Sequence, residues 1–151
     1  MLVASGKNKG KPLELVALKD PCFIQDVISS NAKGREQMAL RAEARRLVDV
    51  FNRRTFGVRC HGRDCDRTAT RCSIYKSDVF NPLWWCDSCD PYQYGAGQHR
   101  IQIVRTYQDI LDFALPFDDP EVAKDLIRVV AKAKGLSPRL GKIQADIFFN
   151  G

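Results

Sequence analysis

The sequence predicts an α+β fold, and three observations lead to this prediction. Apolar residues recur at helical spacing on both sides of a central segment, where that period stops. The central segment, 55–106, is instead rich in cysteine, glycine and aromatic residues, and it contains short alternating runs typical of strands. The length of 151 residues, with 44% apolar and 28% charged residues, fits one globular domain or two small modules that share a core.

The N-terminal segment, residues 1–32, is predicted to be a β-hairpin followed by a helix. Residues 2–19 are expected to be extended around a turn at 6–12, where glycine and asparagine favour a tight reversal. A helix should begin at Asp20-Pro21, because aspartate caps helix N-termini and proline suits the first helical position. The inward face of this helix would carry Phe23, Ile24, Val27 and Ile28.

Residues 33–54 are predicted to form a basic amphipathic helix that links the N-terminal module to the central segment. Its apolar stripe recurs at i, i+4, i+7, i+8 and i+11 and consists of Leu40, Ala44, Leu47, Val48 and Phe51. The arginines fall largely off this stripe, so we expect them to face water or a ligand: Arg41, Arg45, Arg46 and Arg53.

The rest of the chain divides into a central segment, 55–106, and a helical segment, 107–151. Strands are predicted in the central segment at 68–75, 81–86 and 98–104. Trp84 and Trp85 must then point to opposite faces, one toward the core and the other to the surface or an interface. The later helices are expected at 107–114, from Asp119-Pro120 to Gly135, and after Ser137-Pro138.

Four of the six cysteines form two close pairs, Cys60-x4-Cys65 and Cys86-x2-Cys89, separated by twenty residues. Two such pairs resemble a zinc ribbon, in which two turns meet around one tetrahedral Zn²⁺. The resemblance implies that Cys60, Cys65, Cys86 and Cys89 are metal ligands and that the three strands form a zinc-ribbon-like segment. Four thiolates close the coordination of the metal, so such a site is structural and not catalytic.

Alternative ligands remain in the sequence. The first pair has four intervening residues where two are commoner, and Cys72, His61 and His99 are also candidates. Cys72 shares a strand face with Ile74, so we expect it to be a buried, small apolar residue. Cys22 is expected to be a thiol in a helix core. No secretory signal precedes the fold, so a cytoplasmic location is expected, where disulfides are rare.

The positive charge is concentrated in one part of the chain. The formal net charge is +6, and residues 33–76 hold 12 of the 24 basic residues but only 5 of the 18 acidic ones. Such a cluster is either a solvated face or an anion-binding surface, and the arginine fork suits phosphate. The predicted nucleic-acid contacts are Arg45, Arg46, Arg53, Arg54, Arg59, Arg63, Arg67, Arg71, Lys7, Lys9 and Lys11.

A second resemblance lies at the N-terminus. The run Gly6-Lys7-Asn8-Lys9-Gly10, an apolar stretch and Asp20-Pro21-x-Phe23 together resemble a small module at the C-terminal end of exodeoxyribonuclease X-like proteins. The resemblance covers about 25 of the 151 residues. It implies a link to DNA processing, with the three lysines on a hairpin. It implies no exonuclease activity, because the acidic catalytic domain has no counterpart here.

Together these observations favour a non-enzymatic, zinc-containing nucleic-acid-binding protein, with DNA favoured over RNA and contacts mainly to phosphates. The alternative is a zinc-stabilised protein-interaction module, an adaptor or inhibitor in a replication or transcription complex. The motifs of P-loop NTPases, serine hydrolases and zinc proteases do not occur. A small metal-dependent nuclease is a third possibility. No apolar run reaches the ~18 residues of a membrane span, so no membrane partner is expected.

Overall fold

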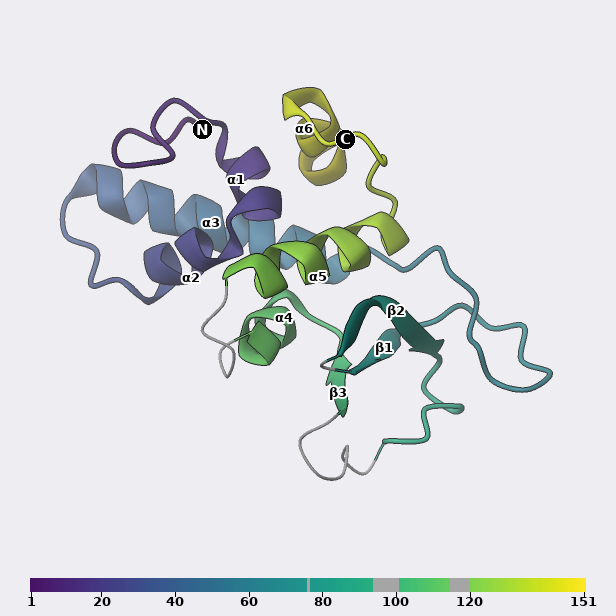
Figure 1. Cartoon of the computed structure of the whole chain (residues 1–151). Coiled ribbons are helices and arrows are strands. Elements are labelled where there is room, and N and C mark those ends of the chain that lie inside the picture. The colour runs from purple at the N-terminus through teal and green to yellow at the C-terminus, as the bar shows by residue number, and fades with distance from the viewer. Residues whose placement is uncertain (76, 94–100, 115–119) are drawn as a thin grey trace.

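Helices make up one part of the molecule and a small antiparallel sheet the other, which confirms the α+β prediction (Figure 1). The computed structural model describes residues 1–75, 77–93, 101–114 and 120–151. The elements in these ranges are α1 (Leu13–Lys19), α2 (Pro21–Ser29), α3 (Arg35–Arg53), β1 (Arg71–Tyr75), β2 (Asp78–Trp85), β3 (Ile101–Val104), α4 (Tyr107–Ala114), α5 (Pro120–Ala133) and α6 (Lys142–Asn150). None of the described helices is long and apolar enough to cross a membrane.

The N-terminal segment is a hairpin-like loop that leads directly into a helix. A single antiparallel bridge joins Leu2 to Pro12, and the Val3 N–H donates to the Lys11 carbonyl at 3.0 Å. The extended structure predicted up to residue 19 is wrong, because residues 13–19 form α1. This helix contacts α2, α3, α5 and α6, and its residues 13–18 are all buried. An element that is buried on all sides has no exposed polar face, so its sequence lacks the alternation of apolar and polar residues that distinguishes a helix from a strand.

Helix α2 begins at the predicted residue, and its cap also holds the N-terminal loop. The Asp20 carboxylate accepts from the Phe23 N–H at 3.3 Å and from the side-chain amide of Asn8 at 3.0 Å. The ammonium of Lys7 lies 3.0 Å from the same carboxylate. Burial alone would raise the pKa of Asp20, but the hydrogen bonds from Asn8, Lys7 and Phe23 lower it. The start of α2 and the loop therefore stabilise each other.

The three strands form an antiparallel sheet in the order β2-β1-β3. Cys72 lies opposite Trp84 on one side and Val104 on the other, and all three are buried toward the helices. Trp85 is half-buried on the opposite face, where its indole N–H donates to the Ser73 hydroxyl at 2.9 Å. The prediction that the two tryptophans point to opposite faces is therefore confirmed.

Helix α5 lies between the N-terminal helices and the sheet, since it contacts α1, α2, α4 and β2 (Figure 1). Its side chains at Leu126, Ile127 and Val130 are fully buried. Helix α4 has the predicted bounds, and α5 ends before Gly135, whose φ of +104° favours glycine. The predicted cap Asp119 and the first residues of the strand predicted at 98–104 lie outside the described residues.

Candidate metal centre

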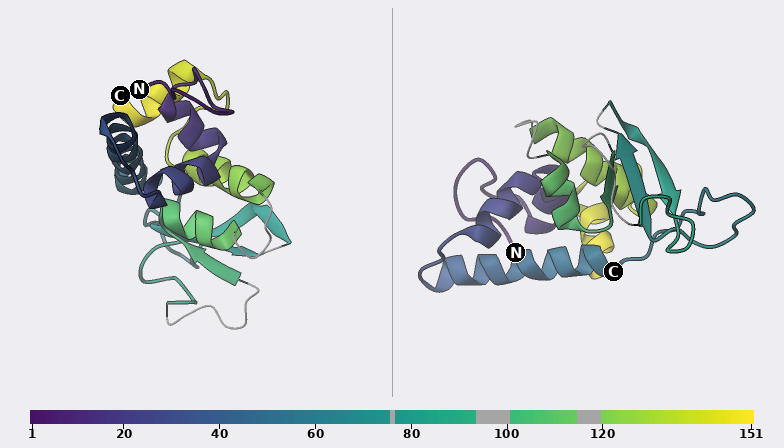
Figure 2. Two further views of the ribbon diagram at one scale, coloured as in Figure 1. Left: turned by 90° about the vertical axis from the view of Figure 1, so that its left-hand side faces the viewer. Right: turned by 90° about the horizontal axis from the view of Figure 1, so that it is seen from below.

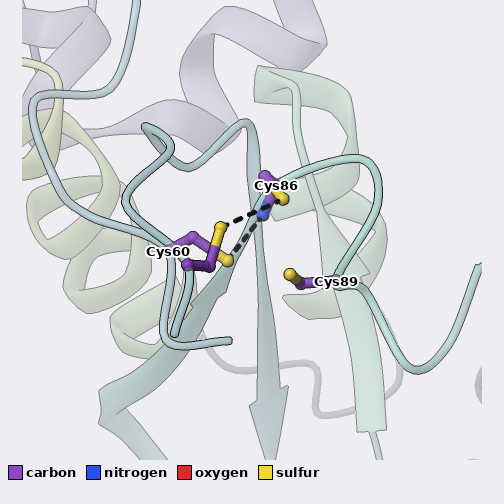
Figure 3. A group of neighbouring side chains, drawn as sticks. Cys60, Cys86 and Cys89 are labelled. Carbon is purple, nitrogen blue, oxygen red and sulfur yellow. Dashed lines mark hydrogen bonds between the residues drawn. The ribbon is translucent and has the colours of Figure 1, made fainter. Parts of the chain in front are cut away.

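The sulfur atoms of Cys60, Cys65, Cys86 and Cys89 all lie within 4.8 Å of one another. The sulfurs of Cys60, Cys86 and Cys89 approach each other in Figure 3. Zn–S bonds of about 2.3 Å in a tetrahedron place the sulfurs about 3.8 Å apart. The distance between the sulfurs of Cys65 and Cys86 is 3.9 Å. The cluster is thus compatible with a four-thiolate metal site.

The first pair of ligands lies in the long loop between α3 and β1, which extends away from the helices (Figure 2). The Gly62 N–H donates to the Cys60 sulfur at 3.3 Å, and the Cys65 N–H donates to the Gly62 carbonyl at 3.2 Å. A Cβ atom at position 62 would lie 2.5 Å from the Cys89 sulfur. The turn therefore needs glycine at this position, because any side chain would displace a sulfur.

The second pair follows β2 directly. The Cys86 N–H donates to the Cys60 sulfur at 3.2 Å and so joins the two turns. Burial alone would raise the pKa of Cys86, but the backbone N–H groups of Cys89 and Ser88 lower it below the ordinary thiol value. The hydrogen bond between Cys89 and the Cys86 sulfur raises the pKa of Cys89.

The alternative ligands take other roles in the structure. The Nδ1 atom of His61 accepts from the Trp84 N–H at 3.2 Å, and the His61 N–H donates to the Trp84 carbonyl at 2.8 Å. Cys72 is completely buried in the sheet core, as predicted, and burial raises its pKa to about 12. Cys22 is half-buried in α2, and burial raises its pKa. His99 lies outside the described residues.

The predicted arginine surface needs correction at two positions. Arg71 is only 7% exposed and pairs with Asp87 and Asp90, so its side chain lies inside the metal module, by which we mean the two cysteine turns and the sheet β2-β1-β3. Arg54 is half-buried and donates to the carbonyl of Lys134, which follows α5, at 3.1 Å and to that of Phe148, in the last turn of α6, at 3.0 Å. Both guanidinium groups are therefore directed toward protein, because the fold brings distant acceptors to them.

Several other cations predicted to bind nucleic acid are exposed but contact protein groups. The Nε of Arg59 donates to the Cys65 carbonyl at 3.0 Å, and Arg67 donates to the Ser88 hydroxyl at 2.9 Å. Arg46 forms an ion pair with Glu43 at 2.7 Å. Among the arginines predicted to contact nucleic acid, those that are exposed and have no hydrogen bond or ion pair to a described residue are Arg45, Arg53 and Arg63. On the N-terminal loop, Lys7, Lys9 and Lys11 are also exposed.

Two features of the structure were not predicted from the sequence. Asp87 and Asp90 lie on either side of Cys89 and bind Arg71; the only signal in the sequence was the presence of two acidic residues beside a candidate ligand. The buried Lys134 had no signal beyond its place before a glycine. Comparisons with protein-family models, curated proteins and solved structures found no match. The metal assignment therefore rests on the geometry of these residues.

Proposed function

We propose that the chain binds one structural Zn²⁺ through Cys60, Cys65, Cys86 and Cys89 and that it binds nucleic acid through exposed arginines of α3 and of the first cysteine turn. The observation that supports the zinc site is the meeting of four sulfurs from two separate turns within 4.8 Å. Thiolates favour Zn²⁺ over harder divalent ions. Four of them leave no coordination position for water, which supports a structural, non-enzymatic role.

The zinc site is tested on the full chain. Purified protein should hold one equivalent of zinc, and replacement by Co²⁺ should produce the thiolate-to-cobalt charge-transfer and visible bands of a tetrahedral four-sulfur site. Changing both Cys86 and Cys89 to serine should remove these bands, whereas Cys72→Ser should keep them. A metal-free native protein, or unchanged cobalt spectra in the double variant, would contradict this assignment.

Nucleic-acid binding is supported by the unpaired arginines. Arg45 and Arg53 lie on the exposed face of α3, and Arg63 lies in the first cysteine turn that follows this helix along the chain. Four thiolates and one Zn²⁺ together carry two negative charges, so the formal charge of +6 becomes +4 in the zinc form. The chain remains basic, and contacts to phosphates would dominate its affinity. The resemblance of residues 6–24 to a module of DNA-processing proteins favours DNA over RNA.

The test is a salt titration of binding to duplex DNA, single-stranded DNA and RNA. We expect affinity to fall steeply with salt, because phosphate contacts release counterions. Changing Arg45, Arg53 and Arg63 together to glutamate should weaken binding at least about tenfold. The control changes Lys132, Arg139 and Lys142, which are exposed in the C-terminal segment, to glutamate. A flat salt dependence, no binding at low salt, or equal losses in both variants would overturn the proposal.

A second candidate function, a protein-interaction module, is favoured by exposed apolar groups on the sheet. Phe80 is 63% exposed, Tyr75 43% and Leu83 39%, and two of the three lie on the edge strand β2. Exposed apolar side chains at a sheet edge are a common site for partner binding. If this role is correct, changing Phe80 and Leu83 to serine removes partner binding and leaves nucleic-acid binding intact.

A further inference from the structure

A buried arginine, Arg71, lies beside the second cysteine turn, Cys86–Cys89. Arg71 is the first residue of β1 and lies opposite Trp85, the residue that precedes Cys86. The Thr70 N–H donates to the Trp85 carbonyl at 2.9 Å, which aligns the start of β1 with the start of the turn. The side chain of Arg71 is 8% exposed and extends toward the residues that carry Cys86 and Cys89.

The guanidinium binds both acids that flank Cys89. One terminal nitrogen lies 3.3 Å from a carboxylate oxygen of Asp90, and the other pairs with Asp87. The Thr70 hydroxyl donates to the same Asp87 oxygen at 2.7 Å. The second oxygen of Asp90 accepts from the Tyr92 N–H at 2.8 Å. Arg71 therefore connects the sheet to both sides of one metal ligand.

Arg71 and Asp90 are both buried, so each charge needs partners within the protein. The Asp90 side chain is 1% exposed, so its carboxylate requires a cation and hydrogen-bond donors within the protein. A guanidinium has a rigid fork that reaches two carboxylates at once, whereas a lysine ammonium is a single point of charge. The cation also lies beside a centre that carries two negative charges when four thiolates hold Zn²⁺.

We propose that Arg71 is a positioning residue for the zinc site: by binding Asp87 and Asp90 together it holds the Cys86–Cys89 turn in the ligating conformation before the metal arrives. This inference rests on the proposed zinc binding. Partners that orient metal ligands in this way typically contribute 10–100-fold to metal affinity. Arg71 was predicted to contact phosphate, but its side chain is 8% exposed and is paired with Asp87 and Asp90.

The test is a competition titration of Zn²⁺ against a chromophoric chelator, on the full chain. Arg71→Met should lower zinc affinity about 10–100-fold, and Arg71→Lys should recover only part of the loss. The control is Arg63→Met, in the other cysteine turn, which should bind zinc as the wild type does. Because Arg71→Met leaves Asp90 without its cation, Asp87→Ala serves as a second variant; the Asp87 side chain is 74% exposed, so the fold tolerates its loss.

The double variant Arg71→Met/Asp87→Ala identifies the mechanism. If Arg71 acts through Asp87, the double variant loses less affinity than the product of the two single losses. Zinc affinity within twofold of the wild type in both Arg71→Met and Asp87→Ala, or multiplicative losses in the double variant, would overturn the inference. These outcomes leave zinc binding by the wild type intact. A wild type that binds no zinc would instead overturn the proposed function, and this inference with it.

Discussion

Arg54 and Lys134 each donate to the backbone carbonyl of the other. The Lys134 ammonium lies 2.9 Å from the Arg54 carbonyl, and the Nε of Arg54 lies 3.1 Å from the Lys134 carbonyl. Lys134 also donates to the Phe51 carbonyl at 2.8 Å, so it satisfies carbonyls at the C-terminal end of α3. Its ammonium lies 4.7 Å from the ring centre of Phe56, and Phe56 packs against Trp84 of the sheet. These contacts of Arg54 and Lys134 therefore join the helices to the metal module.

Replacing Lys134 should weaken the whole fold. In Lys134→Met the buried carbonyls of α3 lose their donor, and an unsatisfied buried group costs about 1–3 kcal/mol. We expect the free energy of unfolding in urea to fall by about 2 kcal/mol. Lys132→Met, two residues away and exposed, should change it by less than about 0.5 kcal/mol. Equal stabilities of the two variants would show that the capping contacts contribute little.

The same residue predicts a pH dependence. Burial, with a smaller contribution from the nearby Arg54 charge, lowers the pKa of Lys134 from 10.5 to about 8. Between these two values the unfolded chain binds more protons than the folded chain, so the free energy of unfolding should rise with pH from about 8 to 10.5. Urea titrations across this range should show the rise in the wild type. A Lys134→Met variant with the same slope would rule out this source.

Gly62 is predicted to be essential for metal binding. In Gly62→Ala the new Cβ would lie 2.5 Å from the Cys89 sulfur and 3.3 Å from the Cys60 sulfur, so at least one ligand must move. Zinc affinity should fall at least about tenfold, as measured by chelator competition. The control is Gly57→Ala, whose Cβ would meet only the Ala133 carbonyl at 3.7 Å. Normal zinc affinity in Gly62→Ala would mean that the turn differs from the one described.

Removal of the metal should unfold one part of the chain. Between residues 57 and 68 only Cys60 is buried, so this loop has almost no core of its own and depends on ligand bonds. The helical part has its own core, which includes Leu13, Ile24, Leu47 and Leu126. Hydrogen exchange after chelation should therefore accelerate in 58–68 while α1, α3 and α5 stay protected. Equal protection with and without chelator in 58–68 would contradict a structural role for the metal.

Local signals in the sequence were sufficient for much of the fold and for the four cysteines whose sulfurs meet. Asp20 predicts the start of α2, the spacing around Tyr107 predicts α4, and the paired cysteines predict the four sulfurs that meet. Each of these signals depends on residues within one turn of helix or one tight loop. Residues 13–19 were predicted wrongly because residues 13–18 of α1 are all buried, so the helix has no exposed face whose period would separate it from a strand.

What the sequence determined by itself is the type of the elements and the chemistry of the four thiols, because neighbouring residues set capping, periodicity and turn formation. Only the tertiary structure decided which cations are available to a ligand. Arg54 meets the Phe148 carbonyl across 94 positions and Arg71 meets Asp90 across 19, so their pairing depends on how the helices and strands pack. An arginine that the sequence predicts to be exposed can be buried in the fold, because packing removes water from its guanidinium and brings a carbonyl or carboxylate within hydrogen-bond distance.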